Sequence, residues 1–433
     1  MQAARPNPRE DEAGYRMASS KNLIGMSAQH KLLLALLIAA ETMLPGCSAS
    51  DDGKPPAGGP DVPGVHMAEL NSDFSKVYLT SSDKNELVVL DAKTLGTDTS
   101  QEALLNRAYI VCRDSGEIGI IDLRTLEMTR KTDYAVLKRL TLGKHPTHMS
   151  PQNERGLLTV MNEDEGSGAV SFIDMNTDTE KKRLSGFFTP HFMRFSPDGK
   201  YGYVANLNAY HVTRVDLDTL EIESHIPLEG FQGPPNHTLA PGEGGFGDAQ
   251  IDRDGVMYAA HHETGRVLVY DTMLRAKRAE LKVGLGPWVA YADHPFHNVP
   301  LRHLVTNFGD KSVSVINGIK EPTVLGSLPG DEQAYGVNYS SLTPNKAFVM
   351  NRMRKDIAVV DTETLEIKER IPVGGNTETA ATTRDGKYVI AAVSGANRVV
   401  VIDAQTNAIV KSFDNFGNYP WSVTIPLGQN YCH

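Results

Sequence analysis

The sequence predicts an all-β protein, namely a β-propeller built from four-stranded antiparallel blades. Residues 192–228 contain four short strand-like segments separated by turn residues such as those of 196–200. A sheet this small cannot bury both faces by itself, so it needs neighbouring copies. The same pattern recurs with a period mostly in the forties, which is typical of a propeller, whereas the strands of a β-sandwich do not recur in phase.

The most regular feature of each unit is a third strand of apolar residues that closes on a carboxylate or an amide. Eight such segments end at Asp91, Asp122, Asp174, Asp216, Asp271, Asn317, Asp361 and Asp403. Eight signals favour eight blades, with seven as the alternative. The interval from Asp91 to Asp122 is 31 residues, against 42 to 55 for the others, so one of the first two blades should be incomplete or borrow a strand. We expect residues 420–426 to pair near residues 65–70 and close the ring.

Short motifs inside the units resemble the YVTN-type propeller repeat. The segments 203–206 (YVAN), 305–307 (VTN) and 349–351 (VMN) stand where that repeat has its namesake motif, and 196–200 (SPDGK) matches its first turn. The resemblance spans roughly residues 66–428 and implies architecture more than activity. The pattern is also distantly similar to the eight-bladed haem d1 domain of bacterial nitrite reductases. Lactonases and the heavy subunit of amine dehydrogenases resemble it in fold.

Composition limits the possible functions. The chain has 433 residues, of which 40% are apolar and 22% charged, which is ordinary for a globular protein. The net charge of −10 without a basic stripe argues against a nucleic-acid partner. The three cysteines have no zinc-type spacing, so a structural zinc site is not expected. We expect residues 65–433 to form a single propeller domain and the protein to be a monomer.

The N-terminal segment predicts export. Nine apolar residues, 32–40, are too few to cross a bilayer and fit the core of a signal peptide spanning residues 1–46. The sequence Leu-Pro-Gly-Cys at 44–47 resembles a bacterial lipobox, although its proline departs from the usual pattern. The resemblance implies cleavage before Cys47 and lipidation of that residue.

A linker rich in glycine, proline and aspartate covers residues 47–64 and suits a tether between lipid and propeller. Ser48 after the cysteine implies delivery to the outer membrane. We therefore expect a periplasmic or cell-surface protein attached to the membrane through its lipid. An oxidising compartment would allow Cys112 and Cys432 to pair, whereas the apolar surroundings of Cys112 favour a buried thiol.

The loops between blades and the loops between second and third strands of a propeller surround one end of its channel. The candidate metal ligands predicted to face this mouth are His145, His148, His191, His237, Glu243 and His261 or its neighbour His262, with Glu332 and Glu378 nearby. Imidazoles and carboxylates can ligate zinc, copper or iron, or act as acid and base. The alternative is that these histidines only make structural hydrogen bonds.

Trp288 and Trp421 each follow a proline at the start of a strand. They would either stack on a flat ligand or anchor the packing between blades. The chain contains no phosphate-binding loop, nucleophile elbow or HExxH motif. We therefore favour a binding or scaffold module that holds a small ligand or a partner protein at the mouth. A protein that binds a transition metal or a tetrapyrrole of the haem d1 type is one alternative, and a lactonase- or dehydrogenase-like enzyme is another.

Overall fold

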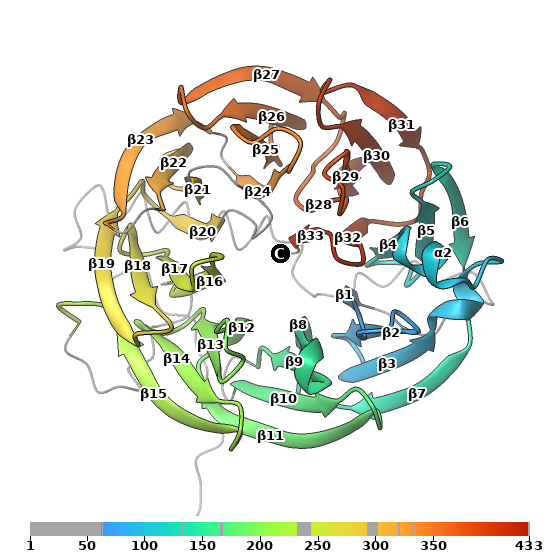
Figure 1. The fold of residues 1–433 in the computed structure, drawn as a ribbon, viewed down its shortest axis with the longest axis horizontal. Helices are drawn as coiled ribbons and strands as arrows, with labels where there is room; N and C mark the ends of the chain where they lie inside the picture. Colours follow the sequence, from blue (N-terminus) through green and yellow to red (C-terminus); the bar gives the residue numbers. More distant parts are fainter. Residues whose placement is uncertain are drawn as a thin grey trace, which may run out of the picture. The chain divides into compact units, whose positions relative to one another are not determined.

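The protein is described by a computed structural model that covers residues 62, 64–131, 134–164, 168–231, 244–291, 302–318, 321–330 and 333–431. Residues 54–433 form one compact unit, whose described strands make a closed ring of eight sheets (Figure 1). The predicted eight-bladed β-propeller is therefore confirmed. The predicted leader, Cys47 and Cys432 lie outside the described residues, as does the predicted tether apart from Val62 and Gly64.

Five blades take four consecutive strands each, with the first strand innermost. They comprise β8 (Pro146–Gln152), β9 (Leu157–Asn162), β10 (Gly168–Asp174) and β11 (Thr179–Phe187); β12 (Pro190–Phe195), β13 (Tyr201–Asn206), β14 (His211–Asp216) and β15 (Glu221–Pro227); β16 (Phe246–Ile251), β17 (Val256–His261), β18 (Arg266–Asp271) and β19 (Ala276–Lys282); β20 (Pro287–Tyr291), β21 (Arg302–Asn307), β22 (Ser312–Asn317) and β23 (Thr323–Pro329); and β24 (Ala334–Tyr339), β25 (Lys346–Asn351), β26 (Asp356–Asp361) and β27 (Glu366–Pro372).

A sixth blade gains a fifth strand from the end of the chain. It contains β28 (Ala380–Thr382), β29 (Tyr388–Val393), β30 (Arg398–Asp403) and β31 (Ile409–Phe413), and β33 (Gln429–Tyr431) pairs with β28 on the channel side.

The two remaining blades interlock the ends of the ring. The first consists of β1 (Val65–Leu70), β2 (Lys76–Ser81), β3 (Glu86–Asp91) and β7 (Val136–Thr141); the second of β32 (Pro420–Thr424), β4 (Arg107–Cys112), β5 (Ile118–Asp122) and β6 (Glu127–Lys131). After β3 the chain passes through a 3-10 turn (Ala92–Leu95) and helix α2 (Gln101–Leu105) into the next blade, then returns as the outer strand β7. This excursion explains the short interval after Asp91, and the second blade does borrow a strand.

The prediction for residues 420–426 needs a correction. This segment hydrogen-bonds to β4, with Pro420 opposite Cys112, and not to β1. The reason is that β4 reaches the ring without an inner neighbour, so its edge is the one that needs a partner. The segment contacts β1 through a side chain: the Thr424 hydroxyl donates a hydrogen bond to the carbonyl oxygen of Ala68 at 2.7 Å.

The repeated aspartates after the third strands build the turns that follow. Oδ1 of Asp216 accepts the backbone N–H groups of Asp218 and Thr219, both at 2.9 Å. Oδ1 of Asp361 makes the equivalent pair of bonds. Such side-chain bonds replace missing backbone partners and fix the turn, which is why the strand ending in Asp is the clearest repeat in the sequence.

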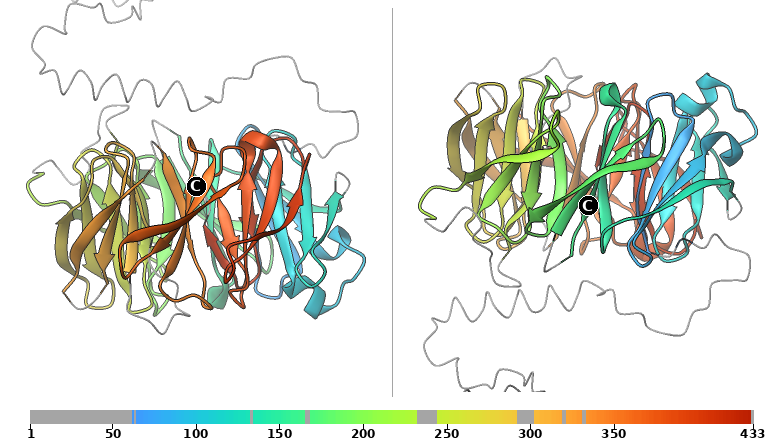
Figure 2. Two further views of the ribbon diagram at one scale, coloured as in Figure 1. Left: turned by 90° about the horizontal axis from the view of Figure 1, so that it is seen from above. Right: turned by 90° about the horizontal axis from the view of Figure 1, so that it is seen from below.

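The hydrophobic core lies between neighbouring blades. Inner and middle strands such as β9 are buried throughout, whereas the outer strand β11 alternates between exposed and covered residues. Figure 2 shows the blades edge-on, with their strands running between the two faces of the ring. The innermost strands begin at one face of the ring, which we call the mouth face. We call the opposite face the far face. Among the described residues, no helix has the length and hydropathy of a membrane span.

Candidate metal centre

A β-bulge near the start of the innermost strand recurs in seven blades, and it presents side chains at the mouth of the channel. The register shifts between Val65 and Ala68, Pro146 and Met149, Pro190 and Phe192, Phe246 and Ala249, Pro287 and Ala290, Ala334 and Val337, and Pro420 and Ser422. Bulges re-aim side chains and are common next to functional sites. The residues inside these shifts include His66, His148, His191, Gly247, Trp288, Tyr335 and Trp421. We call this ring of residues the mouth.

Three ionisable side chains from two neighbouring blades meet there. His148 belongs to β8, His191 belongs to β12, and Glu163 directly follows β9. Nδ1 of His148 lies 3.1 Å from Oε1 of Glu163, and Nδ1 of His191 lies 2.9 Å from the same oxygen. Among the described residues, these three are the only group whose ligand atoms, all within 4.8 Å of one another, could hold a metal ion.

The backbone of one blade holds Glu163 in place. Its N–H donates to the carbonyl oxygen of His145 at 3.0 Å. His145 has a φ of 53°, and its own N–H donates to Oδ1 of Asn85 at 2.8 Å. The Thr147 hydroxyl donates to Oε1 of Glu163 at 2.6 Å. The carboxylate is therefore fixed before any ligand arrives, which lowers the cost of binding.

A third imidazole extends the cluster. Nε2 of His66 lies 3.2 Å from Nε2 of His148. Because the Glu163 carboxylate only accepts hydrogen bonds, Nδ1 of His148 carries the proton in this arrangement. Nε2 of His148 is then the acceptor, and His66 is the donor. The hydrogen bond from His66 therefore meets the edge of the His148 ring opposite Glu163 and helps to orient that imidazole.

The surroundings of these groups favour the protonation states that a metal requires. Burial lowers the pKa of His148 to about 4 and holds the pKa of His66 well below its ordinary value. Burial works to raise the pKa of Glu163, but His191 and His148 outweigh it and hold this pKa well below its ordinary range. Near neutral pH, His66 and His148 are therefore uncharged beside an ionised carboxylate, and metal ions bind these forms.

Two indole rings flank the row of imidazoles. The ring centroids are 5.9 Å apart for Trp421 and His66, 4.5 Å for His66 and His148, 4.2 Å for His148 and His191, and 5.9 Å for His191 and Trp288. β16 intervenes between the strands of His191 and Trp288, and its residue at this level is Gly247. A Cβ at Gly247 would lie 2.2 Å from the carbonyl oxygen of Trp288. Glycine is therefore needed for the close approach.

The other half of the mouth carries arginines. Cζ of Arg113 lies 3.9 Å from the ring centroid of Tyr419 and 5.5 Å from that of Trp421. Nε of Arg352 lies 2.7 Å from Oε1 of Glu378, and both side chains are buried. Burial raises the pKa of Glu378 to about 7 although Arg352 and Arg113 oppose this. The mouth is thus divided into a histidine side and an arginine side.

The structure brings together only some of the predicted ligands. His148 and His191 share the centre, while His145 contributes its backbone carbonyl to the placement of Glu163. His261 lies elsewhere, stacked on Tyr210 with ring centroids 5.0 Å apart. The predicted residues His237 and Glu243 lie outside the described residues, as does Glu332.

Sequence reasoning missed His66 and Glu163. His66 occupies the same place in its strand as His148, His191, Trp288 and Trp421, so an alignment of the first strands of all blades would have found it. Glu163 follows Asn162 at the end of a second strand. Its proximity to His191 depends on the packing of one blade against the next.

No protein-family model and no curated protein matches the chain, but solved structures do. A protein from Lactobacillus plantarum is 14% identical, with a TM-score of 0.55 over 75% of this chain and 98% of that chain. The dihydro-haem d1 dehydrogenase NirN is 16% identical, with a TM-score of 0.50 over 75% and 76%. Hydrazine synthase from Kuenenia stuttgartiensis is 16% identical, with a TM-score of 0.50 over 79% and 96%. At these identities the similarity shows the fold alone.

Proposed function

We propose that this protein is an exported, lipid-anchored propeller that binds a divalent transition-metal ion at its mouth and holds a small ligand or a partner there. The observation that carries the proposal is the convergence of His148, Glu163 and His191. Two imidazoles and a carboxylate are a donor set that suits zinc or iron(II).

The distances within the cluster support a metal. Metal–ligand bonds of about 2.0–2.1 Å in a tetrahedral site place neighbouring ligand atoms about 3.3 Å apart. The distances from Glu163 to the two Nδ1 atoms, 3.1 and 2.9 Å, are close to this value. His66 meets Nε2 of His148, on the opposite edge of that ring from Glu163, so it does not belong to this set. Small rotations of His148, Glu163 and His191 would therefore complete a three-ligand site.

Three protein ligands leave a coordination position for something else. Sites with open positions bind water, substrates or other small ligands, whereas closed four-ligand sites are structural. His66 contacts Nε2 of His148, on the opposite edge of that ring from Glu163, so it would orient the His148 imidazole instead of binding the same ion. A mouth centre of this kind suits a binding module, which is the function we favoured from the sequence.

The proposed location rests on the N-terminal sequence. The apolar segment 32–40, Cys47 and the linker 47–64 together support export, lipidation and a tether. Replacing Cys47 with Ser should release the protein from the membrane fraction into the soluble periplasmic fraction. Retention of the Cys47→Ser variant in the membrane fraction would contradict the lipid anchor.

The metal is tested by elemental analysis of the purified protein together with its absorption spectrum. We expect close to one equivalent of zinc or iron per chain, and a Co²⁺-substituted form with visible d–d bands. Glu163→Gln and His191→Ala should each lower metal affinity by about 100-fold, since each removes one of three ligands. His225→Ala, in the outer strand β15, is the matched control and should retain the metal.

Two results would overturn the metal centre. One is protein that takes up no stoichiometric metal although it is folded. The other is metal that survives in the Glu163→Gln, His191→Ala double variant. An intense tetrapyrrole absorption in the purified protein would replace the simple ion with a cofactor at the same mouth.

A further inference from the structure

The mouth contains two hydrogen-bond donors, one at each end of the row of imidazoles, that no described residue satisfies. Nε1 of Trp421 and Nε1 of Trp288 are both buried without a hydrogen-bond acceptor among the described residues. The Trp421 side chain is only 7% exposed. An indole N–H can only donate, and a buried donor without an acceptor is costly. The two indoles therefore call for a ligand that brings acceptor atoms.

The position of Arg113 adds a positive charge to the same place. Its guanidinium lies against Tyr419 and near Trp421, and its Nε donates to Oδ1 of Asp114 at 2.9 Å. These contacts orient the cation at the edge of the mouth. A guanidinium held in this way binds carboxylates and other oxyanions.

The cations around the mouth can attract an anion. Arg352 lies 2.7 Å from Glu378, and Nε of Arg113 lies 2.9 Å from Oδ1 of Asp114. A guanidinium carries five N–H donors, so the contact from Nε to Asp114 leaves other donors of Arg113 for a second oxyanion. A divalent metal with Glu163 would leave one excess positive charge and attract the same anion.

The walls of the mouth are flat and aromatic. Tyr419 and Trp421 stack with centroids 5.9 Å apart. Trp288 stacks on Phe308 at 5.7 Å, and Phe308 stacks on Tyr335 at 5.5 Å. Stacked rings of this kind accommodate a planar apolar body between a few fixed polar groups.

We propose that the mouth binds a planar organic anion, with its oxyanion held by Arg113 and the indole N–H of Trp421 beside the metal. This inference deepens the proposed function and rests on it in placing the anion next to a metal ion. The expected ligand is a flat, conjugated carboxylate or a similar oxyanion.

The chain offers a specific readout, because its only two tryptophans are Trp288 and Trp421. Intrinsic tryptophan fluorescence of the full chain therefore reports the mouth alone. We would titrate the metal-loaded protein with benzoate and compare benzamide, which keeps the ring without the charge, and acetate, which keeps the charge without the ring. We expect saturable binding of benzoate, and affinities for the other two probes that are at least about tenfold weaker.

Matched variants locate the anion. Arg113→Gln should weaken benzoate by about tenfold or more and leave metal loading unchanged. Trp421→Phe keeps the flat wall but removes the N–H, so it should weaken benzoate by a few fold. Arg124→Gln is the control, because Arg124 lies in the far-face turn of the same blade and pairs with Asp122 at 2.6 Å.

The outcomes separate this inference from the metal centre. Metal-loaded protein that does not distinguish benzoate from benzamide, or binds neither, overturns the anion site and leaves the metal in place. An Arg113→Gln variant with unchanged benzoate affinity also overturns it. A further outcome is folded protein that takes up no metal and still binds benzoate, with this binding lost in Arg113→Gln. That result supports the anion site and overturns the metal centre.

Discussion

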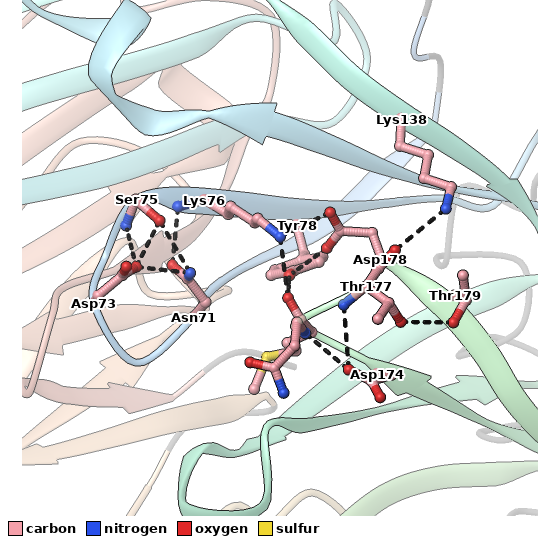
Figure 3. A network of polar contacts seen from close by, with 12 residues as sticks. Asn71, Asp73, Ser75, Lys76, Tyr78, Lys138, Asp174, Thr177, Asp178 and Thr179 are labelled. Carbon is pink, nitrogen blue, oxygen red and sulfur yellow. Dashed lines mark hydrogen bonds and ion pairs between the residues drawn. The ribbon is translucent and has the colours of Figure 1, made fainter.

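The first blade and the blade of β8–β11 meet at two polar clusters, one at each end of the ring. At the far face, Nζ of Lys76 lies 2.7 Å from Oδ2 of Asp178, and the hydroxyl of Tyr78 donates to Oδ1 of Asp178 at 2.9 Å (Figure 3). At the mouth, His66 of the same first blade meets His148 across a gap of 3.2 Å. Both clusters bridge the same pair of sheets.

The two clusters differ in how their polar groups are matched. In the far-face network, turns hold both partners: Asp73 accepts the N–H of Ser75 at 3.0 Å, and Asp174 accepts that of Asn176 at 2.9 Å. Opposite charges then meet directly. At the mouth, two imidazoles share one carboxylate oxygen of Glu163, and indole donors nearby have no acceptor among the described residues.

This difference distinguishes a structural network from a site prepared for a ligand. Matched charges in fixed turns join the blades without needing anything else. Imidazoles that share one carboxylate oxygen, and buried indole donors without an acceptor, leave polar groups for a metal or an anion to satisfy, and proteins accept such costs at functional sites. Both clusters are inter-blade contacts, so it is their chemistry and not their position that separates them.

The largest effect we expect is loss of stability in acid, which depends on histidines outside both clusters. Burial lowers the pKa of His211, His261 and His303 to about 3, from an ordinary value of 6.5. Each stays neutral in the folded protein and gains a proton when unfolded, so stability is full above about pH 6.5 and falls below it. Between about pH 7 and pH 5 each should cost about 1–2 kcal/mol, measured by urea unfolding at both values.

His303→Gln should reduce the loss of unfolding free energy between pH 7 and pH 5 by the contribution of one histidine, about 1–2 kcal/mol. Asp178→Ala should leave the size of this loss unchanged. Burial also raises the pKa of Glu69 to about 8 and the pKa of Glu378 to about 7. These carboxyls favour the folded protein as the pH falls, so the test is the difference between the wild type and His303→Gln. A pH effect of the same size in both proteins would show that His303 is not buried uncharged.

The next effect is expected at the far face. Within the described part of the chain, Asp178→Ala removes the only carboxylate that pairs with the mostly buried ammonium of Lys76 and leaves this group and the hydroxyl of Tyr78 with the carbonyl of Met175 alone, so it should cost about 3 kcal/mol. Metal loading should not change, because the mouth lies at the other end of the blades. Lys138→Ala is the control: Nζ of Lys138 makes one exposed, long bond of 3.4 Å to the carbonyl of Thr177, so its loss should cost less than about 0.5 kcal/mol. Equal costs for the two variants would remove the distinction between network and surface contact.

The smallest effect concerns the glycine that lets the mouth form. Gly247→Ala should destabilise the protein by about 2 kcal/mol, because its Cβ would meet the Trp288 backbone. Tryptophan fluorescence should shift as Trp288 moves away from His191. In Gly326→Ala, the added Cβ would lie 2.9 Å from Cδ1 of Leu365, a side chain that can move, so this strand glycine is the matched control. An unchanged fluorescence spectrum in Gly247→Ala would show that Gly247 does not position the indole.

Much of the architecture could be predicted from the sequence because its signals are local. An aspartate that caps its own turn, as Asp216 does, leaves the same mark in each repeat. The short interval after Asp91 also indicated an irregular first pair of blades. The partner of residues 420–426 could not be derived this way, since it depends on which strand edge, that of β1 or of β4, is left without a neighbour after the chain has folded back.

The sequence by itself determined the repeated four-stranded unit, favoured eight blades over seven, and placed histidines and tryptophans at the starts of inner strands, because strand period and turn chemistry act over a few residues. Only the tertiary structure decided which of them meet. It placed Glu163 between His148 and His191, added His66, and moved His261 into an aromatic stack, since those contacts depend on bulges and on the rotation of one sheet against the next. Side chains distant in sequence become neighbours only when the ring closes.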